Sequence, residues 1–78
     1  MKELQSLNDI KPGERCIIRK IILSGAEGQR LLDMGFVRGV ELQVKRNAPF
    51  SDPFEVKING YFINLRHLEA DLVKVERL

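Results

Sequence analysis

Cysteine is almost absent from this sequence of 78 residues, since Cys16 is the only one. A single cysteine forms no internal disulfide, which excludes the small secreted folds that depend on several of them. Long apolar runs are absent too: the longest span two or three residues, as at 17–18 and 21–23. A membrane-spanning helix needs about 20 predominantly apolar residues. We therefore expect neither a membrane span nor a signal peptide, and a reducing, cytoplasmic setting.

Groups that carry catalysis are equally scarce. His67 is the only histidine, and Gly25 and Gly28 lack both the spacing of a phosphate-binding loop and the Lys-Ser/Thr that closes one. No HExxH, CxxC or nucleophile-elbow motif is present. There is also no tryptophan to build the aromatic groove with which SH3 domains bind proline-rich peptides. We therefore predict that the chain is not an enzyme and needs no cofactor.

Charge of one sign is not in large excess. Thirteen Lys and Arg oppose eleven Asp and Glu, which gives a net charge of +2 and a pI near 8.9. The two signs are interleaved along the chain, as on an ordinary solvated surface, and the excess is too small to indicate nucleic acid by itself. A chain of this length forms one small domain, here residues 1–78, which buries only about 60% of its unfolded surface.

The residues that are present predict β-structure most clearly between positions 30 and 65. The segment RLLDM indicates a short helix that ends at Gly35, and VELQV alternates apolar and polar residues as a half-buried strand does. Asn59-Gly60 is the signature of a two-residue hairpin turn. The register that follows from this turn opposes Phe54 to Leu65, Val56 to Ile63 and Ile58 to Tyr61. All six side chains, Tyr61 included, are then predicted on the inner face.

The flanking segments complete a small barrel. Pro12-Gly13 predicts a turn before a strand over residues 14–23, whose two faces are both partly apolar, as in a strand that bends between two sheets. Ser24 and Glu27 have the spacing of a capping box ahead of the helix. Residues 66–70 read as one helical turn, and residues 72–75 as a last strand that closes against the first. We predict an all-β SH3-like barrel of about five strands with one short inserted α-helix, the alternative small barrel being an OB-fold.

Three sets of residues are candidates for a site. His67 with Glu69 or Asp71 supplies part of a ferrous or other transition-metal site, because such sites recruit imidazole and carboxylate. The competing interpretation makes His67 an exposed turn residue and Cys16 a small buried apolar group. Leu31, Leu32 and Met34 are predicted to cover the open end of the barrel. Phe50, between Pro49 and Pro53, falls outside the alternation of both neighbouring strands and either plugs the barrel mouth or contacts a partner.

Several segments together resemble a known family. They are PGE, RLLDMG, the glycine at position 39, NAPFSDPFEV and LRHLEADLVKV, in an order and spacing similar to the ferrous-iron transport protein A (FeoA-like) family. The likeness runs from about Leu7 to Val75. Arg38 replaces the proline usual before Gly39, and Phe50-Ser51 replaces leucine-glycine. Both departures lie in turns or loops.

The resemblance implies a cytoplasmic SH3-like barrel that works with a membrane ferrous-iron transporter carrying a cytoplasmic GTPase domain. The same module resembles the C-terminal domain of iron-dependent repressors, but no DNA-binding segment precedes it in this sequence, so we do not expect a repressor. We expect a non-catalytic accessory protein that docks on the transporter and regulates it. The alternatives are a direct Fe²⁺-binding protein and, below it, a small-barrel nucleic-acid-binding module.

The surface that we expect to contact the partner is the loop at residues 48–53 with two arginines beside it. It combines an apolar residue that falls outside the strand pattern with positive charge that fits an acidic patch. The predicted contact residues are Arg38, Arg46, Pro49, Phe50, Asp52 and Pro53.

Overall fold

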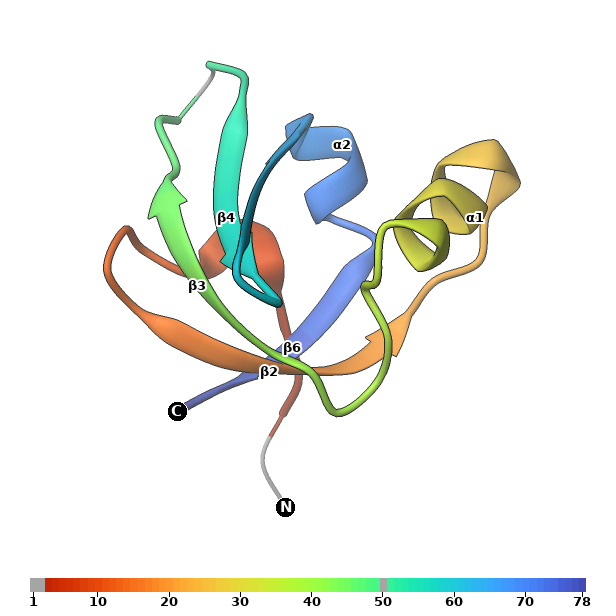
Figure 1. Cartoon of the computed structure of the whole chain (residues 1–78), viewed down its shortest axis with the longest axis horizontal. Coiled ribbons are helices and arrows are strands. Elements are labelled where there is room, and N and C mark those ends of the chain that lie inside the picture. The colour runs from red at the N-terminus through yellow and green to blue at the C-terminus, as the bar shows by residue number, and fades with distance from the viewer. Residues whose placement is uncertain (1–2, 50) are drawn as a thin grey trace.

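The computed structural model describes residues 3–49 and 51–78. The chain forms one curled antiparallel sheet whose strands lie in the order β1-β6-β2-β3-β4-β5 (Figure 1). The elements are β1 (Gln5–Ser6), the 3₁₀ turn η1 (Leu7–Asp9), β2 (Arg15–Ile21), α1 (Gly25–Asp33), β3 (Glu41–Arg46), β4 (Phe54–Ile58), β5 (Tyr61–Leu65), α2 (His67–Ala70) and β6 (Val73–Arg77). No helix among the described residues is long and apolar enough to cross a membrane.

The core follows the alternation of the strands. The inward residues of β2, β3, β4 and β6 are fully or almost fully buried, and the two helices and η1 close the open sides of the curled sheet. Leu31 of α1 is buried and Met34 packs partly against the same cluster, as predicted for residues that cover the barrel end, whereas Leu32, the third residue of that prediction, is only partly buried. The buried apolar residues are Leu7, Ile10, Cys16, Ile18, Leu31, Phe36, Leu42, Val44, Phe54, Val56, Ile58, Leu65, Ala70, Val73 and Val75.

The hairpin register predicted from Asn59-Gly60 is confirmed, with Phe54 opposite Leu65, Val56 opposite Ile63 and Ile58 opposite Tyr61. The prediction that Tyr61 points into the core is wrong, because its side chain is 71% exposed. Ile58 lies between Leu42 and Tyr61, whereas Tyr61 is on the last strand of the sheet and has a neighbour on one side only.

The first long strand bends as its mixed apolar faces predict. β2 pairs with β3 over Arg15 to Ile17 and with β6 from Cys16 to Ile21, and the register with β6 shifts between Ile18 and Lys20. Such a bulge turns the strand and changes which side chains face inward. The pairing of β6 with β2 confirms the predicted closure of the last strand against the first long strand.

Two short elements were not predicted from the sequence. β1 adds a two-residue edge strand to β6, and η1 follows it directly. The Ser6 hydroxyl accepts a hydrogen bond from the Asn8 N–H at 3.1 Å, which caps η1. Pairing over two residues leaves no alternation to detect, so the sheet has six strands where about five were expected.

The ends of α1 differ in how well the sequence predicts them. Gly35 (φ +97°) ends the helix as predicted: its N–H donates to the Leu32 carbonyl and the Phe36 N–H donates to the Leu31 carbonyl, both at 3.0 Å. This Schellman arrangement directs Phe36 into the core. The predicted capping box is wrong, because Ser24 makes no side-chain capping bond. Gly25 (φ +65°), the first residue of α1, has a left-handed backbone conformation directly after Ser24.

Gly28 lies where α1 touches the chain that precedes it. A Cβ on this residue would lie 3.0 Å from the Ile22 carbonyl oxygen and 3.0 Å from the Leu23 Cα. Gly→Ala inside a helix usually stabilises by about 1 kcal/mol. We expect Gly28→Ala instead to lower the free energy of unfolding, by about 1 kcal/mol, because backbone atoms must move. Urea unfolding tests this, and the exposed neighbour Gln29→Ala should change stability by less than about 0.5 kcal/mol.

Candidate functional site

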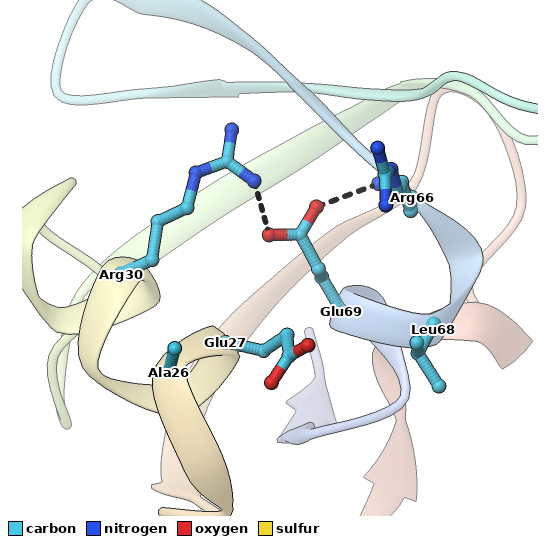
Figure 2. A pocket seen from close by; sticks show the side chains of 6 residues that line it. All are labelled: Ala26, Glu27, Arg30, Arg66, Leu68 and Glu69. Atoms are coloured by element: carbon cyan, nitrogen blue, oxygen red, sulfur yellow. Dashed lines mark hydrogen bonds and ion pairs between the residues drawn. The ribbon is translucent and has the colours of Figure 1, made fainter.

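A pocket of about 230 Å³ opens between α1 and α2 (Figure 2). The first helix presents Ala26, Glu27 and Arg30 to it, and the second presents Leu68 and Glu69, with Arg66 just before that helix. Both charge signs line the pocket, and Leu68 forms an exposed apolar edge. The arrangement offers polar contacts for another molecule, and the lining holds neither histidine nor cysteine.

Glu69 joins the two helices at this pocket. Its Oε2 accepts a hydrogen bond from Arg30 Nη1 at 2.5 Å, and its Oε1 accepts one from the Arg66 N–H at 3.0 Å (Figure 2). The residue is only 2% exposed. The carboxylate satisfies an N–H at the start of α2 that has no helical partner, and its remaining charge is balanced by a guanidinium.

A second group of polar side chains, which we call the histidine cluster, consists of Asn47, Asp52 and His67. His67 begins α2, and its Nδ1 lies 2.7 Å from Asp52 Oδ1, which also accepts a bond from the His67 N–H at 2.9 Å. His67 Nε2 lies 3.1 Å from Asn47 Oδ1. The ring meets Phe54 edge-on, with the centroids 5.5 Å apart. His67 is thus a half-buried residue with polar partners on both ring nitrogens.

The histidine cluster is tied to the N-terminal segment. Asn47 Nδ2 donates to the Asn8 carbonyl at 2.9 Å and to the Ile10 carbonyl at 2.8 Å. In return, Asn8 Nδ2 donates to the His67 carbonyl at 2.9 Å. Three segments that are distant in the sequence are therefore held together by side-chain amides and one imidazole.

The two candidate metal ligands have different partners. His67 contacts Asp52 and Asn47, whereas Glu69 contacts Arg30 and a backbone N–H. No three His, Cys, Asp or Glu side chains gather at a common point within residues 3–49 and 51–78. Direct binding of Fe²⁺ through His67 and Glu69 remains a sequence-based prediction.

Cys16 is fully buried in the core, as the apolar interpretation predicted. Burial raises the pKa of its thiol to about 12, and the Glu14 carboxylate adds to the shift. Only the thiolate reacts with alkylating agents. We therefore expect the native protein to resist iodoacetamide at neutral pH and the urea-unfolded protein to be alkylated, with mass spectrometry as the readout. Rapid alkylation of the native protein would contradict this burial.

Asp52 makes folding sensitive to acid. The hydrogen bond from the His67 side chain, followed by that from the His67 N–H, lowers the pKa of Asp52 below its ordinary value of 3.8. A lowered folded-state pKa stabilises the protein above the unfolded value, and this stabilisation is lost as the pH falls through the folded one. Asp52→Asn should therefore be less stable than wild type at about pH 5, and the difference should shrink as the pH falls through the folded-state pKa of Asp52, as measured by urea unfolding. A constant difference would contradict the assignment.

The structure divides the predicted contact residues between two ends of β3. Arg46 lies opposite Glu55 at the end of β3, on the same side as Pro49, Asp52 and Pro53. Arg38 precedes the start of β3, where Leu42 lies opposite Ile58 at the hairpin end. The structure therefore does not place Arg38 beside the loop. Phe50 lies outside the described residues.

The hairpin end carries exposed aromatic side chains that the sequence interpretation missed. Tyr61 is 71% exposed and Phe62 is 62% exposed, both on the outermost strand β5. Phe62 lies opposite Lys57, whose ammonium is 5.7 Å from the centre of its ring. The alternation along β5 was the available signal for Phe62, because it places this residue on the outer face with Lys57. For Tyr61 the same alternation predicted an inward-facing side chain, whereas the side chain is exposed.

The fold is that of a small SH3-like barrel with a pocket lined by side chains of both charge signs. Residues 5–77 match the model of the FeoA domain family, and the chain belongs to that family.

Relatives with known structures agree with this assignment. The FeoA-like protein of Clostridium acetobutylicum is 31% identical, with a TM-score of 0.89 over 100% of this chain and 91% of that one. The FeoA of Stenotrophomonas maltophilia, described as a prokaryotic SH3 domain protein and solved with zinc, is 25% identical, with a TM-score of 0.82 over 92% and 89% of the two chains. The predicted family and the SH3-like fold are both confirmed. IdeR from T. acidophilum shares the fold at 15% identity, with a TM-score of 0.86 over 100% of this chain and 36% of its own.

A longer relative is a fusion protein, and this chain is similar to one part of it. The Fe(2+) transport protein A/Fe(2+) transporter FeoB fusion protein of Porphyromonas gingivalis is 33% identical over 70 residues. The matched region is 90% of this chain and 8% of that protein. Membership of the family and this fusion connect the chain with ferrous-iron transport.

Proposed function

We propose that this chain is a non-catalytic, cytoplasmic accessory protein of ferrous-iron uptake that docks on a membrane ferrous-iron transporter with a GTPase domain and regulates it. The observation that carries the proposal is the fusion in Porphyromonas gingivalis, where a segment similar to 90% of this chain is joined to a ferrous-iron transporter. A covalent link keeps two modules at a high effective concentration, which is useful when they act together. The same contact between separate chains then requires a docking surface.

The hairpin surface, which we define as Arg38, Lys57, Tyr61 and Phe62, is the docking surface that we propose. Gly35 lies against the Asn59 side chain, so the segment that leads to Arg38 runs beside the hairpin turn. Exposed Tyr and Phe side chains are enriched in protein interfaces, where they supply large contact area at little loss of side-chain entropy. The two cations favour an acidic patch on the partner.

Mapping by NMR tests the surface. Amide shifts of the labelled chain would be followed while the soluble GTPase domain of the transporter is added. We expect saturable shifts at residues 35–38 and 57–64, and a loss of affinity of at least about tenfold in a Tyr61→Ala/Phe62→Ala variant. Arg46→Ala, at the other end of β3, serves as the matched control and should bind as wild type does.

Other results of this NMR titration would lead to different conclusions about the docking site. Shifts confined to residues 46–53 would keep the partner and return the docking site to the loop predicted from the sequence. An absence of shifts at saturating domain concentration would contradict docking on the GTPase domain. An anaerobic Fe²⁺ titration that perturbs His67 would then favour direct metal binding.

A further inference from the structure

The outer edge of β5 carries main-chain groups that point away from the sheet. β5 is the last strand in the sheet order and pairs with β4. The two-residue turn makes Ile58 and Tyr61 a hydrogen-bonded pair, and such pairs recur at every second residue along the hairpin. Phe62 and Asn64 lie between these pairs, so their N–H and C=O groups face outward. No hydrogen bond from another residue that the structure describes reaches these groups.

This edge is accessible, and its sequence favours pairing with another strand. Phe62 is 62% exposed, and Asn64 is exposed as well. Proteins commonly protect an edge strand with charged residues, with proline or with a bulge. The sequence of β5, YFINL, contains neither a charged residue nor proline, and its register with β4 is regular from end to end. The edge can therefore accept a further strand through main-chain hydrogen bonds.

We propose that β5 pairs with β5 of a second copy of this chain, antiparallel and centred on Ile63, so that two molecules join edge to edge. A two-fold axis makes such a contact self-complementary. In this register Phe62 of each copy forms a hydrogen-bonded pair with Asn64 of the other, so both outward residues of each strand gain partners. Centring the contact on Phe62 would set Asn64 against the turn residue Gly60. Centring it on Asn64 would set Phe62 against Arg66, which lies beyond the strand.

The side chains that meet across this contact are compatible. The residues opposite each other are uncharged: Tyr61 with Leu65 of the second copy, Phe62 with Asn64, and Ile63 with its own counterpart. Charged residues lie one strand back, where Lys57 is opposite Phe62 and Glu55 is opposite Asn64. Lys57 of one copy therefore shares a cross-strand row with Glu55 of the other. Each such row carries charges of opposite sign, so a second copy supplies a matching edge by itself.

Pairing of two copies competes with docking on the transporter. It covers Phe62, which also belongs to the hairpin surface, so one copy cannot present this ring to both partners at once. A contact between two short strands is smaller than a stable interface, which buries at least about 1,200 Å². We therefore expect a weak dimer that forms only at high protein concentration. The pairing itself does not depend on the proposed transporter partner.

Sedimentation equilibrium of the chain alone tests the pairing, at concentrations from about 10 μM to about 1 mM. We expect the weight-average mass to rise from the monomer value of 9.0 kDa toward the dimer value. The amide signals of residues 61–65 should shift with the same concentration dependence. A wild-type mass that stays at 9.0 kDa over the whole range would overturn the inference. That result would also be found if the edge accepted only an extended segment of another protein.

Asn64→Pro and Asn64→Ala are the matched variants. Proline removes the outward N–H, which the pairing with β4 does not use, whereas alanine keeps it. We expect Asn64→Ala to dimerise within about twofold of wild type and Asn64→Pro to dimerise at least about tenfold more weakly. Equal association of the two variants, or concentration-dependent shifts confined to residues outside β4 and β5, would overturn the inference. The wild-type mass and shifts remain decisive even if Asn64→Pro fails to fold.

Discussion

Replacing Phe36 with Ala is expected to lower the free energy of unfolding by about 3–5 kcal/mol. Phe36 is among the largest fully buried side chains and is placed by the glycine stop of α1, where its N–H bonds to the Leu31 carbonyl. Removing the ring leaves a cavity that rigid neighbours fill only in part. A small domain has about 5–15 kcal/mol of total stability, so the variant should lose much of it. Urea unfolding followed by circular dichroism measures the loss.

Phe62→Ala provides the matched control, because it removes the same ring from a position that is 62% exposed. The Lys57 ammonium lies over its ring, and an exposed cation–π pair is worth about 0.5–1 kcal/mol. We expect a loss of about 1 kcal/mol or less. Equal losses in the two variants would show that Phe36 is not part of the core.

Replacing Glu69 with Ala is expected to lower the free energy of unfolding by about 2 kcal/mol. The substitution removes the acceptor for the Arg66 N–H at the start of α2 and the carboxylate that holds Arg30. A hydrogen bond at a helix start contributes about 1 kcal/mol. The ion pair adds a comparable amount and no more, because the Arg30 side chain is 57% exposed and solvent weakens the attraction.

Two variants separate these contributions. Glu69→Gln keeps an oxygen for the Arg66 N–H but loses the charge, so its loss should be about half that of Glu69→Ala. Glu27→Ala removes an exposed carboxylate from the same pocket and should change stability by less than about 0.5 kcal/mol. If Glu27→Ala costs as much as Glu69→Ala, the assigned role of Glu69 is wrong.

The parts of the fold that could be predicted are those set by local chemistry. Asn59-Gly60 determines the hairpin register, and Gly35 ends α1, because each demands a backbone conformation that few other residues adopt. The exposure of Tyr61 could not be predicted in this way, since it depends on β5 being the last strand of the sheet. The prediction of a side-chain capping bond from Ser24 was wrong. Gly25 adopts a left-handed conformation that the spacing of Ser24 and Glu27 does not reveal.

The polar sites were harder to predict because they join residues that are distant in the sequence. Glu69 is held by Arg30, which is 39 residues away, and His67 lies against Asp52 and Asn47, 15 and 20 residues away. The sequence identified His67, Glu69 and Asp52 as polar residues of interest, but it indicated neither their pairings nor the burial of Glu69. It also grouped Arg38 with the loop, although the length of β3 separates them.

Ferrous-iron uptake measured in anaerobic host cells tests the central claim most directly. The comparison is between cells that lack this chain and the same cells supplied with wild type or with the Tyr61→Ala/Phe62→Ala variant. We predict that loss of the chain lowers uptake, that wild type restores it, and that the variant does not restore it despite accumulating as a folded protein to the same level. Uptake that is unchanged by removal of the chain would contradict the account.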